Sequence, residues 1–181
     1  MDISALRKNL PAIDAAAGEM LGLFGPGFTG TQESHVETDI AAAASLAGLL
    51  MLRSKGFELS TFKPGTAIFT ELDTEMEEIW GFMAGVCRDL GLDPSSGWTM
   101  EIPETHKPLF SIPEMTQKIE KVFLAICGRH ELQPAFFPYV AAMAALKMVA
   151  KAHADHRLDQ DTGKALTGYY VVAGAKTVPF S

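Results

Sequence analysis

The apolar residues of this chain recur at intervals of three and four positions, the spacing of one face of an α-helix. This pattern predicts helices over residues 33–56, 70–90, 112–129 and 135–155. The first two carry acidic residues in their first turns and end at or just before a glycine, which is typical of helix termini. Residues 3–23 predict one or two further helices, with Pro11 in the first turn of the second.

The run from Ile40 to Leu52 is rich in alanine and is interrupted only by Ser45 and Gly48. A helix that is apolar nearly all round belongs in the centre of a fold, and small residues let neighbouring helices approach it closely. The run is shorter than the ~18 to 20 residues needed to span a bilayer. We therefore expect a buried helix at the centre of a soluble protein.

The last periodic segment, residues 162–178, predicts a helix capped near Asp161 or Thr162, although Tyr169 to Val172 also resembles a strand. Two connections, residues 56–69 and 92–110, are longer than usual links between helices. The predicted fold is an all-α, single-domain bundle of about six helices over residues 1–181, with a central Ala-rich helix and two long loops.

Composition and charge narrow the functional classes. The net charge is −7 and no run of basic residues can neutralise several phosphates, so we expect neither nucleic-acid nor membrane binding. The first residues lack the pattern of a secretory signal, and we expect a cytoplasmic location. The two cysteines, Cys87 and Cys127, are expected to be buried and reduced.

The two long connections carry large apolar side chains, and two interpretations follow. In one, the connections lie flat over the bundle and close its core; in the other, they form a lid over a pocket. The second interpretation predicts that a small apolar ligand binds at Phe62, Trp98, His106 and Phe110.

Histidines offer a candidate metal site. His153 and His156 are three residues apart and share a face if the helix extends that far, so that both imidazoles can bind one divalent metal ion. An antiparallel pairing of the helices over residues 112–129 and 135–155 brings them near His106 and Glu114. The alternative is that His153 simply ends a core stripe while Asp159 and Asp161 cap the next helix. No established metalloenzyme motif is present, and the sequence indicates no other cofactor.

The segment LFGPGFTG, residues 23–30, spaces Gly25, Gly27 and Gly30 as in dinucleotide-binding loops. The residues before it predict a helix rather than a strand, and the lysine of a P-loop is missing. The segment is therefore expected to join two helices, with glycines in positive-φ conformations and Phe28 as an anchor.

Two functional hypotheses remain open at this point. The first is a non-enzymatic helical domain that self-associates as a homodimer, or binds a partner or a small apolar ligand. The second is a metal-dependent, hydrolase-like enzyme with a His/Glu site around His153 and His156.

Overall fold

The computed structural model of the protein describes residues 3–54, 56, 59–68 and 72–180. Within these residues the chain forms seven α-helices and four short 3₁₀ helices. The α-helices are α1 (Ile3–Met20), α2 (Pro26–Thr29), α3 (Val36–Ser54), α4 (Asp73–Asp89), α5 (Ile112–Arg129), α6 (Phe137–Ala154) and α7 (Gln160–Gly174). The 3₁₀ helices are η1 (Leu21–Leu23), η2 (Leu59–Thr61), η3 (Glu104–His106) and η4 (Pro134–Phe136). The predicted all-α bundle is confirmed.

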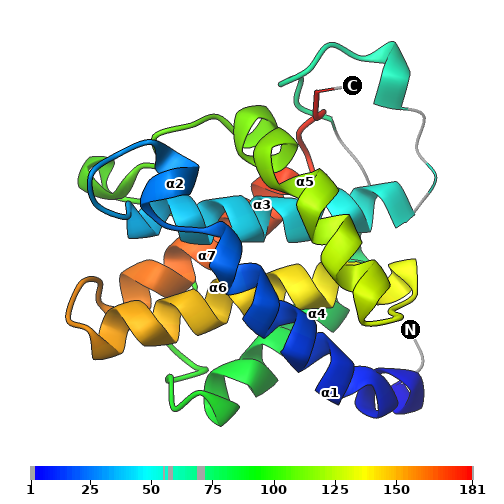
Figure 1. Cartoon of the computed structure of the whole chain (residues 1–181), viewed down its shortest axis with the longest axis horizontal. Helices are drawn as coiled ribbons and strands as arrows, with labels where there is room; N and C mark the ends of the chain where they lie inside the picture. The colour runs from blue at the N-terminus through cyan, green and yellow to red at the C-terminus, as the bar shows by residue number, and fades with distance from the viewer. Residues whose placement is uncertain (1–2, 55, 57–58, 69–71, 181) are drawn as a thin grey trace.

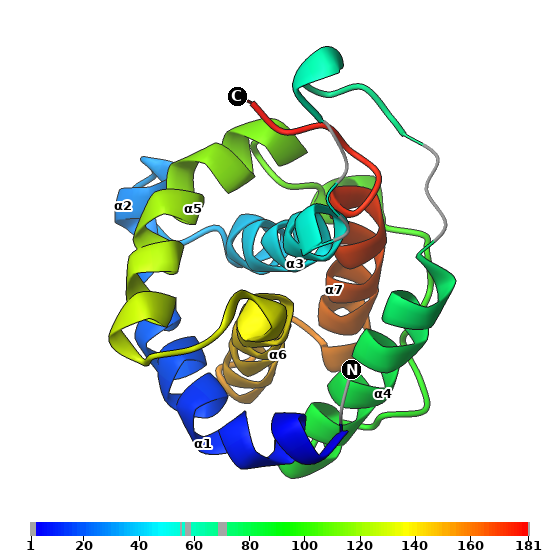
Figure 2. The same ribbon diagram turned by 90° about the vertical axis from the view of Figure 1, so that its right-hand side faces the viewer.

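Two helices, α3 and α6, lie at the centre of the bundle (Figures 1 and 2). α3 packs against α5, α6 and α7, while α6 packs against α1, α3, α4 and α7. The expected position of the Ala-rich helix is confirmed, because all its residues from Thr38 to Leu52 are buried. α6 is more deeply buried than its predicted single stripe implies, since every residue from Pro138 to Leu146 is buried.

Close packing between α3 and α7 depends on residues without side chains. A Cβ atom added to Gly48 would lie 2.5 Å from the backbone nitrogen of Ala175 and closer still to the carbonyl oxygen of Val171. A Cβ atom on Gly174 would lie 2.8 Å from Cα of Ser45. The backbones of the two helices are therefore in direct contact, as the small residues of the central helix predicted.

The structure decides between alternatives that the sequence left open at two helices. Residues 3–20 form one continuous helix with Pro11 inside it, so one helix and not two is present there. α7 begins two residues before the predicted range 162–178. Its N-cap is Asp159, whose side chain accepts a hydrogen bond from the Thr162 backbone N–H, as the alternative interpretation of the histidine region expected for this residue. Residues 169–172 are helical within α7, which decides between the two predicted conformations.

The first long connection pairs with the C-terminal segment. Ala67 and Thr177 form an isolated antiparallel bridge, and the backbone N–H of Ile68 donates to the carbonyl oxygen of Lys176 at 2.8 Å. Residues 65–68 and 176–178 thus hold one another at the end of the bundle beyond α7 (Figure 2).

One segment of the described chain, Pro134–Ala154, is long and apolar enough to cross a membrane by length and composition alone. In this structure 67% of its most apolar window is buried inside the protein, because α6 is one of the two central helices. Burial among other helices accounts for the same composition in a core helix.

Candidate functional site

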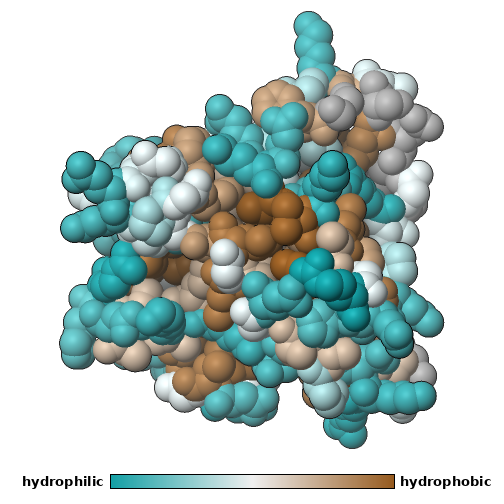
Figure 3. All heavy atoms as spheres, viewed as in Figure 1, coloured by the Kyte–Doolittle hydropathy of each residue, from teal (hydrophilic) through white to brown (hydrophobic). Residues whose placement is uncertain are grey.

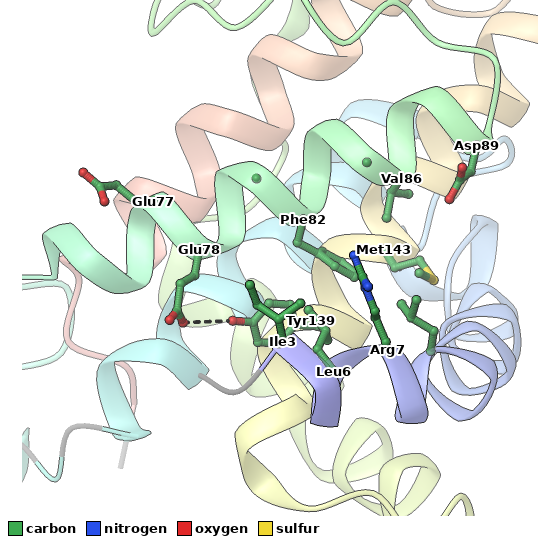
Figure 4. Close-up of a pocket in the computed structure, with 13 residues that line it drawn as sticks. Ile3, Leu6, Arg7, Glu77, Glu78, Phe82, Val86, Asp89, Tyr139 and Met143 are labelled. Carbon is green, nitrogen blue, oxygen red and sulfur yellow. Dashed lines mark hydrogen bonds between the residues drawn. The ribbon is translucent and has the colours of Figure 1, made fainter.

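A pocket of about 550 Å³ opens between α1, α4 and α6 (Figure 4). Its apolar wall is formed by side chains from all three helices. These are Ile3, Leu6 and Leu10 of α1, Phe82 and Val86 of α4, and Tyr139 and Met143 of α6. The volume lies within the ~300 to 1,000 Å³ that is usual for small-ligand sites.

The apolar wall follows from helix periodicity on α4. Ile79, Met83 and Cys87 are fully buried in the core, so Phe82 and the residues one turn on either side of it lie beside the core stripe. Phe82 packs edge-on against Tyr139 with ring centroids 5.0 Å apart, which joins α4 to α6 at the base of the pocket. Ile3 stays 67% exposed at the pocket edge and leaves apolar surface open to a ligand.

Charged groups surround the apolar wall. Arg7 is the basic residue of the described lining, and Glu77, Glu78 and Asp89 are its acidic residues. In Figure 4 Arg7 extends from α1 towards α4, while Glu77 points away from the pocket. Polar groups placed around an apolar base are typical of sites that orient a ligand.

Tyr139 contributes a buried hydroxyl group to the pocket. Its phenol O–H donates to a carboxylate oxygen of Glu78 at 3.4 Å (Figure 4). Burial raises the pKa of Tyr139 far above its usual range, and the neighbouring charge of Glu78 raises this pKa further. Tyr139 therefore stays protonated and acts as a hydrogen-bond donor near neutral pH.

Two glycines of α4, Gly81 and Gly85, also line the pocket. A Cβ atom added to either would meet nothing within 4 Å, so the helix backbone is left uncovered at this point. Side chains at these positions would occupy the pocket instead. Glycine is unfavourable inside a helix, and here its placement leaves space for a ligand.

The four residues predicted to bind a ligand lie in different surroundings. Trp98 packs edge-on against Trp80 with centroids 5.2 Å apart, and its indole N–H donates to the carbonyl oxygen of Pro94. Phe110 packs against Phe28 and lies beneath the ammonium group of Lys118. His106 contacts Glu37, and Phe62 is 49% exposed. These contacts favour the interpretation in which the long connections lie flat over the bundle.

The loop that carries Trp98 is held by a lysine without exposed surface. Lys164 of α7 is 0% exposed, and its ammonium group donates to the carbonyl oxygen of Asp93 at 2.6 Å and to Oγ of Ser96 at 3.3 Å. It also pairs with the carboxylate of Asp161 at 3.0 Å. The hydrogen bonds and the ion pair satisfy the buried charge, which fits a structural role for Lys164.

Three of the four predicted metal ligands line one hollow. His106, His153 and His156 surround a space of about 350 Å³ with Arg157, Leu158 and Asp159. The two neighbouring histidines do not share a helical face, because α6 ends at Ala154 and His156 has a φ of +54°. The structure nevertheless places η3, which carries His106, beside the end of α6, as the predicted helix pairing implies.

Glu114 has a different role from the predicted one. It forms a capping box with Ser111, in which its carboxylate accepts the Ser111 backbone N–H at 2.8 Å and the Ser111 hydroxyl at 2.6 Å. Among the described residues, no group of three or more His, Cys, Asp and Glu side chains is placed to hold a metal ion. The metal site stays a prediction, for which metal analysis of untagged protein is the direct test.

The glycine-rich segment forms a joint between helices, as predicted. Gly25 has a φ of +114° and Gly30 a φ of +72°, on either side of the single turn of α2. Phe28 anchors this joint by packing edge-on against Phe24 and Phe110.

Comparison with known proteins gives no relative from which a function can be transferred. No protein-family model matches the chain, no curated protein matches its sequence, and no solved structure matches its fold. The class of protein that the structure defines is an all-α bundle with an open apolar pocket between three helices.

Reasoning from the sequence missed this pocket because its lining comes from three separate helices. Arg7, Phe82 and Tyr139 are far apart in the chain, and nothing in the spacing of any one helix brings them together. One signal was available: Gly81 and Gly85 are one helical turn apart on a helix whose other face is apolar.

Proposed function

We propose that this protein binds a small, mainly apolar ligand in the pocket between α1, α4 and α6. The observation that carries the proposal is an open pocket of about 550 Å³ with an apolar wall and charged groups at its edge. Soluble proteins usually fill such spaces with their own side chains, and cavities of this size that stay open are typically ligand sites. The two glycines of α4 keep this one open.

The lining indicates which parts of a ligand would lie where. The base of the pocket offers an apolar contact surface, formed by Phe82, Val86 and Met143. Arg7 is exposed and Glu78 is half-buried, and both suit a polar or charged group at one end of the ligand. The favoured ligand is therefore amphipathic, with most of its surface apolar.

The test is a binding experiment with a variant whose pocket is filled. The apolar fluorescent probe anilinonaphthalene sulfonate is titrated into the full chain, and a saturable increase in fluorescence is expected. In Gly85→Leu the new side chain enters the pocket, because no atom stands within 4 Å of its Cβ position. Probe binding should then fall by about tenfold or more, while the helix content and the thermal transition are retained.

Gly128→Leu is the matched control, since Gly128 is also a helical glycine whose Cβ position is open, but it lies on α5. This variant should bind the probe as the natural protein does. Equal probe binding by the natural protein and by folded Gly85→Leu would overturn the proposal.

A second candidate function is self-association as a homodimer. An apolar area of the surface gathers between α5 and the segment of η1 and α2 (Figure 3), where Leu23, Phe28, Ile119 and Val122 line a hollow. The three- and four-residue spacing of Met115, Ile119, Val122 and Ile126 predicts that Val122 lies in a buried stripe of α5. It is instead 46% exposed, and a second copy of this chain would cover it.

Sedimentation velocity tests this second candidate. Val122→Glu should shift a dimer to monomer, whereas Leu124→Glu should not, because Leu124 is exposed on α5 beside a different hollow. A natural protein that sediments as a monomer at all concentrations would exclude the dimer.

A further inference from the structure

The guanidinium group of Arg7 stands at the pocket between α1, α4 and α6 without a partner. Among the described residues it has neither a hydrogen bond nor an ion pair, although three carboxylates line the same pocket. In Figure 4 the Arg7 side chain extends from α1 across the pocket towards Phe82 and Val86 of α4. An unpaired guanidinium beside an apolar wall is a group that a carboxylate of a ligand can bind.

The three carboxylates of the lining are directed elsewhere or lie apart from one another. Glu78 accepts the phenol O–H of Tyr139 at 3.4 Å, and Glu77 points away from the pocket (Figure 4). Asp89 ends α4, and the helical rise of about 1.5 Å per residue separates it from Glu78 by about 16 Å along the helix. The acids are therefore spread along α4 rather than gathered around the guanidinium of Arg7.

The start of α1 adds a second positive contribution at the same place. α1 begins at Ile3, and Ile3, Leu6 and Arg7 of its first two turns all line the pocket. The N-terminus of a helix carries a partial positive charge, and the first turn of α1 has no acidic residue to offset it. An anion bound beside Arg7 would be stabilised by the guanidinium and by the helix end together.

We propose that the ligand of this pocket is a carboxylic acid with an alkyl tail, bound as the carboxylate by Arg7, with its tail along Phe82, Val86 and Met143. The inference rests on the proposed function, because it names the ligand class of the same pocket. The planar guanidinium offers paired N–H donors that fit the two oxygens of a carboxylate. An amine with the same tail would bring two positive charges together at Arg7, and an alcohol would leave the guanidinium without a counter-charge.

The experiment compares three probes that share one alkyl tail. Sodium octanoate, octylammonium chloride and 1-octanol are titrated separately into the ¹⁵N-labelled full chain at neutral pH, and amide chemical shifts are followed by NMR. The amides of Gly81 and Gly85 report on the pocket, because both glycines line it. Octanoate should give saturable shifts there and bind about tenfold more tightly than octanol, and octylammonium should bind more weakly than octanol.

Two neighbouring substitutions identify the cation responsible. Arg7→Gln keeps part of the side-chain stem and removes the charge, and should reduce octanoate binding to about the level of octanol. Lys8→Gln is the matched control, because Lys8 is the next residue of α1, is exposed and stands outside the described lining of the pocket. Each substitution removes one positive charge from the chain, so a difference between them reports the local effect of Arg7. Octanoate should bind Lys8→Gln within about twofold of its affinity for the natural protein.

Three results would overturn the inference and leave the proposed function standing. These are equal binding of octanoate and octanol, tighter binding of octylammonium than of octanoate, and equal binding of octanoate by Arg7→Gln and Lys8→Gln. The second result would mean that the acids of α4 select a cation. The absence of saturable shifts with all three probes would instead overturn the proposed function, and this inference with it.

Discussion

Gly48 of α3 and Val171 of α7 stand so close that a methyl group on the glycine would collide with the carbonyl oxygen of the valine. The neighbouring backbone nitrogen of Ala175 would lie 2.5 Å from the same methyl carbon. Both obstacles are backbone atoms within or at the end of a helix, and neither can turn aside as a side chain can. The separation of α3 and α7 is therefore set by the absence of a side chain at Gly48.

Gly48→Ala should destabilise the protein by about 3 kcal/mol or more, because α7 has to move away from α3 to admit the methyl group. Urea denaturation followed by circular dichroism gives the free energy of unfolding. Ser45→Ala on the same helix is the comparison, since the Ser45 hydroxyl is buried without a hydrogen-bond partner among the described residues. That variant should be as stable as the natural protein or slightly more so. If Gly48→Ala had the same free energy of unfolding as the natural protein, the close contact between α3 and α7 would be contradicted.

A glycine-to-alanine substitution on α4 should have the opposite effect on the free energy of unfolding. Gly85→Ala places a methyl group in the open pocket, where no atom stands within 4 Å, and relieves the unfavourable presence of glycine inside a helix. The free energy of unfolding should rise by about 0.5 to 1 kcal/mol. Thermal melting and urea denaturation measure it, and a loss of stability would mean that the pocket is closed in solution.

Lys164→Met should detach the loop that carries Trp98. The methionine side chain fills the space of the lysine stem but leaves the carbonyl oxygen of Asp93 without its buried donor, at an expected cost of about 1 to 3 kcal/mol. Both tryptophans of the protein, Trp80 and Trp98, form one edge-on pair, so their fluorescence should shift to longer wavelength as the pair separates.

Lys151→Met is the control for this experiment. Its ammonium group is paired with Asp155 on the surface, where the side chain is 72% exposed, and such pairs contribute little. Stability should stay within about 0.5 kcal/mol of the natural protein. If Lys164→Met behaved in the same way, the lysine would not hold the loop.

Acid should loosen the same loop. Hydrogen bonds from Ser95, and then from Ser96, lower the pKa of Asp93 to about 2 in the folded protein, below the value of about 3.9 expected for an unfolded chain. A lowered folded pKa means that Asp93 stabilises the fold above about pH 4 and loses this effect as the pH falls from about 4 to 2.

Asp93→Asn isolates this effect from that of the other carboxyl groups. The variant should show a smaller fall in melting temperature between about pH 5 and pH 2.5 than the natural protein shows. Tryptophan fluorescence over the same range reports on the loop, since Trp98 follows Asp93 by five residues. Identical pH profiles for the two proteins would mean that Asp93 does not hold the loop.

Much of the fold was predictable because it depends on local periodicity and on helix ends. The Ala-rich run around Gly48 was expected at the centre of the fold and is found there, since a helix that is apolar on all sides has no face to turn to water. The helix predicted over residues 112–129 begins where expected, and Ser111 directly before it contacts the Glu114 carboxylate three residues later through its hydroxyl. Such features involve residues within a few positions of one another.

The candidate sites were less predictable, because each is formed by segments distant in the chain. Arg7 looks in the sequence like an ordinary base near the start of a helix, and only the packing of α1 beside α4 and α6 places it in the lining of a pocket. The pocket beside Phe82 likewise exists only where α1 and α6 cross α4. The sequence by itself determined the helices, the central position of α3 and the turns at Gly25 and Gly30, because these follow from short-range sterics and hydrophobic periodicity. Which side chains meet across helices was decided only by the tertiary structure, because contacts between distant segments depend on how whole helices pack.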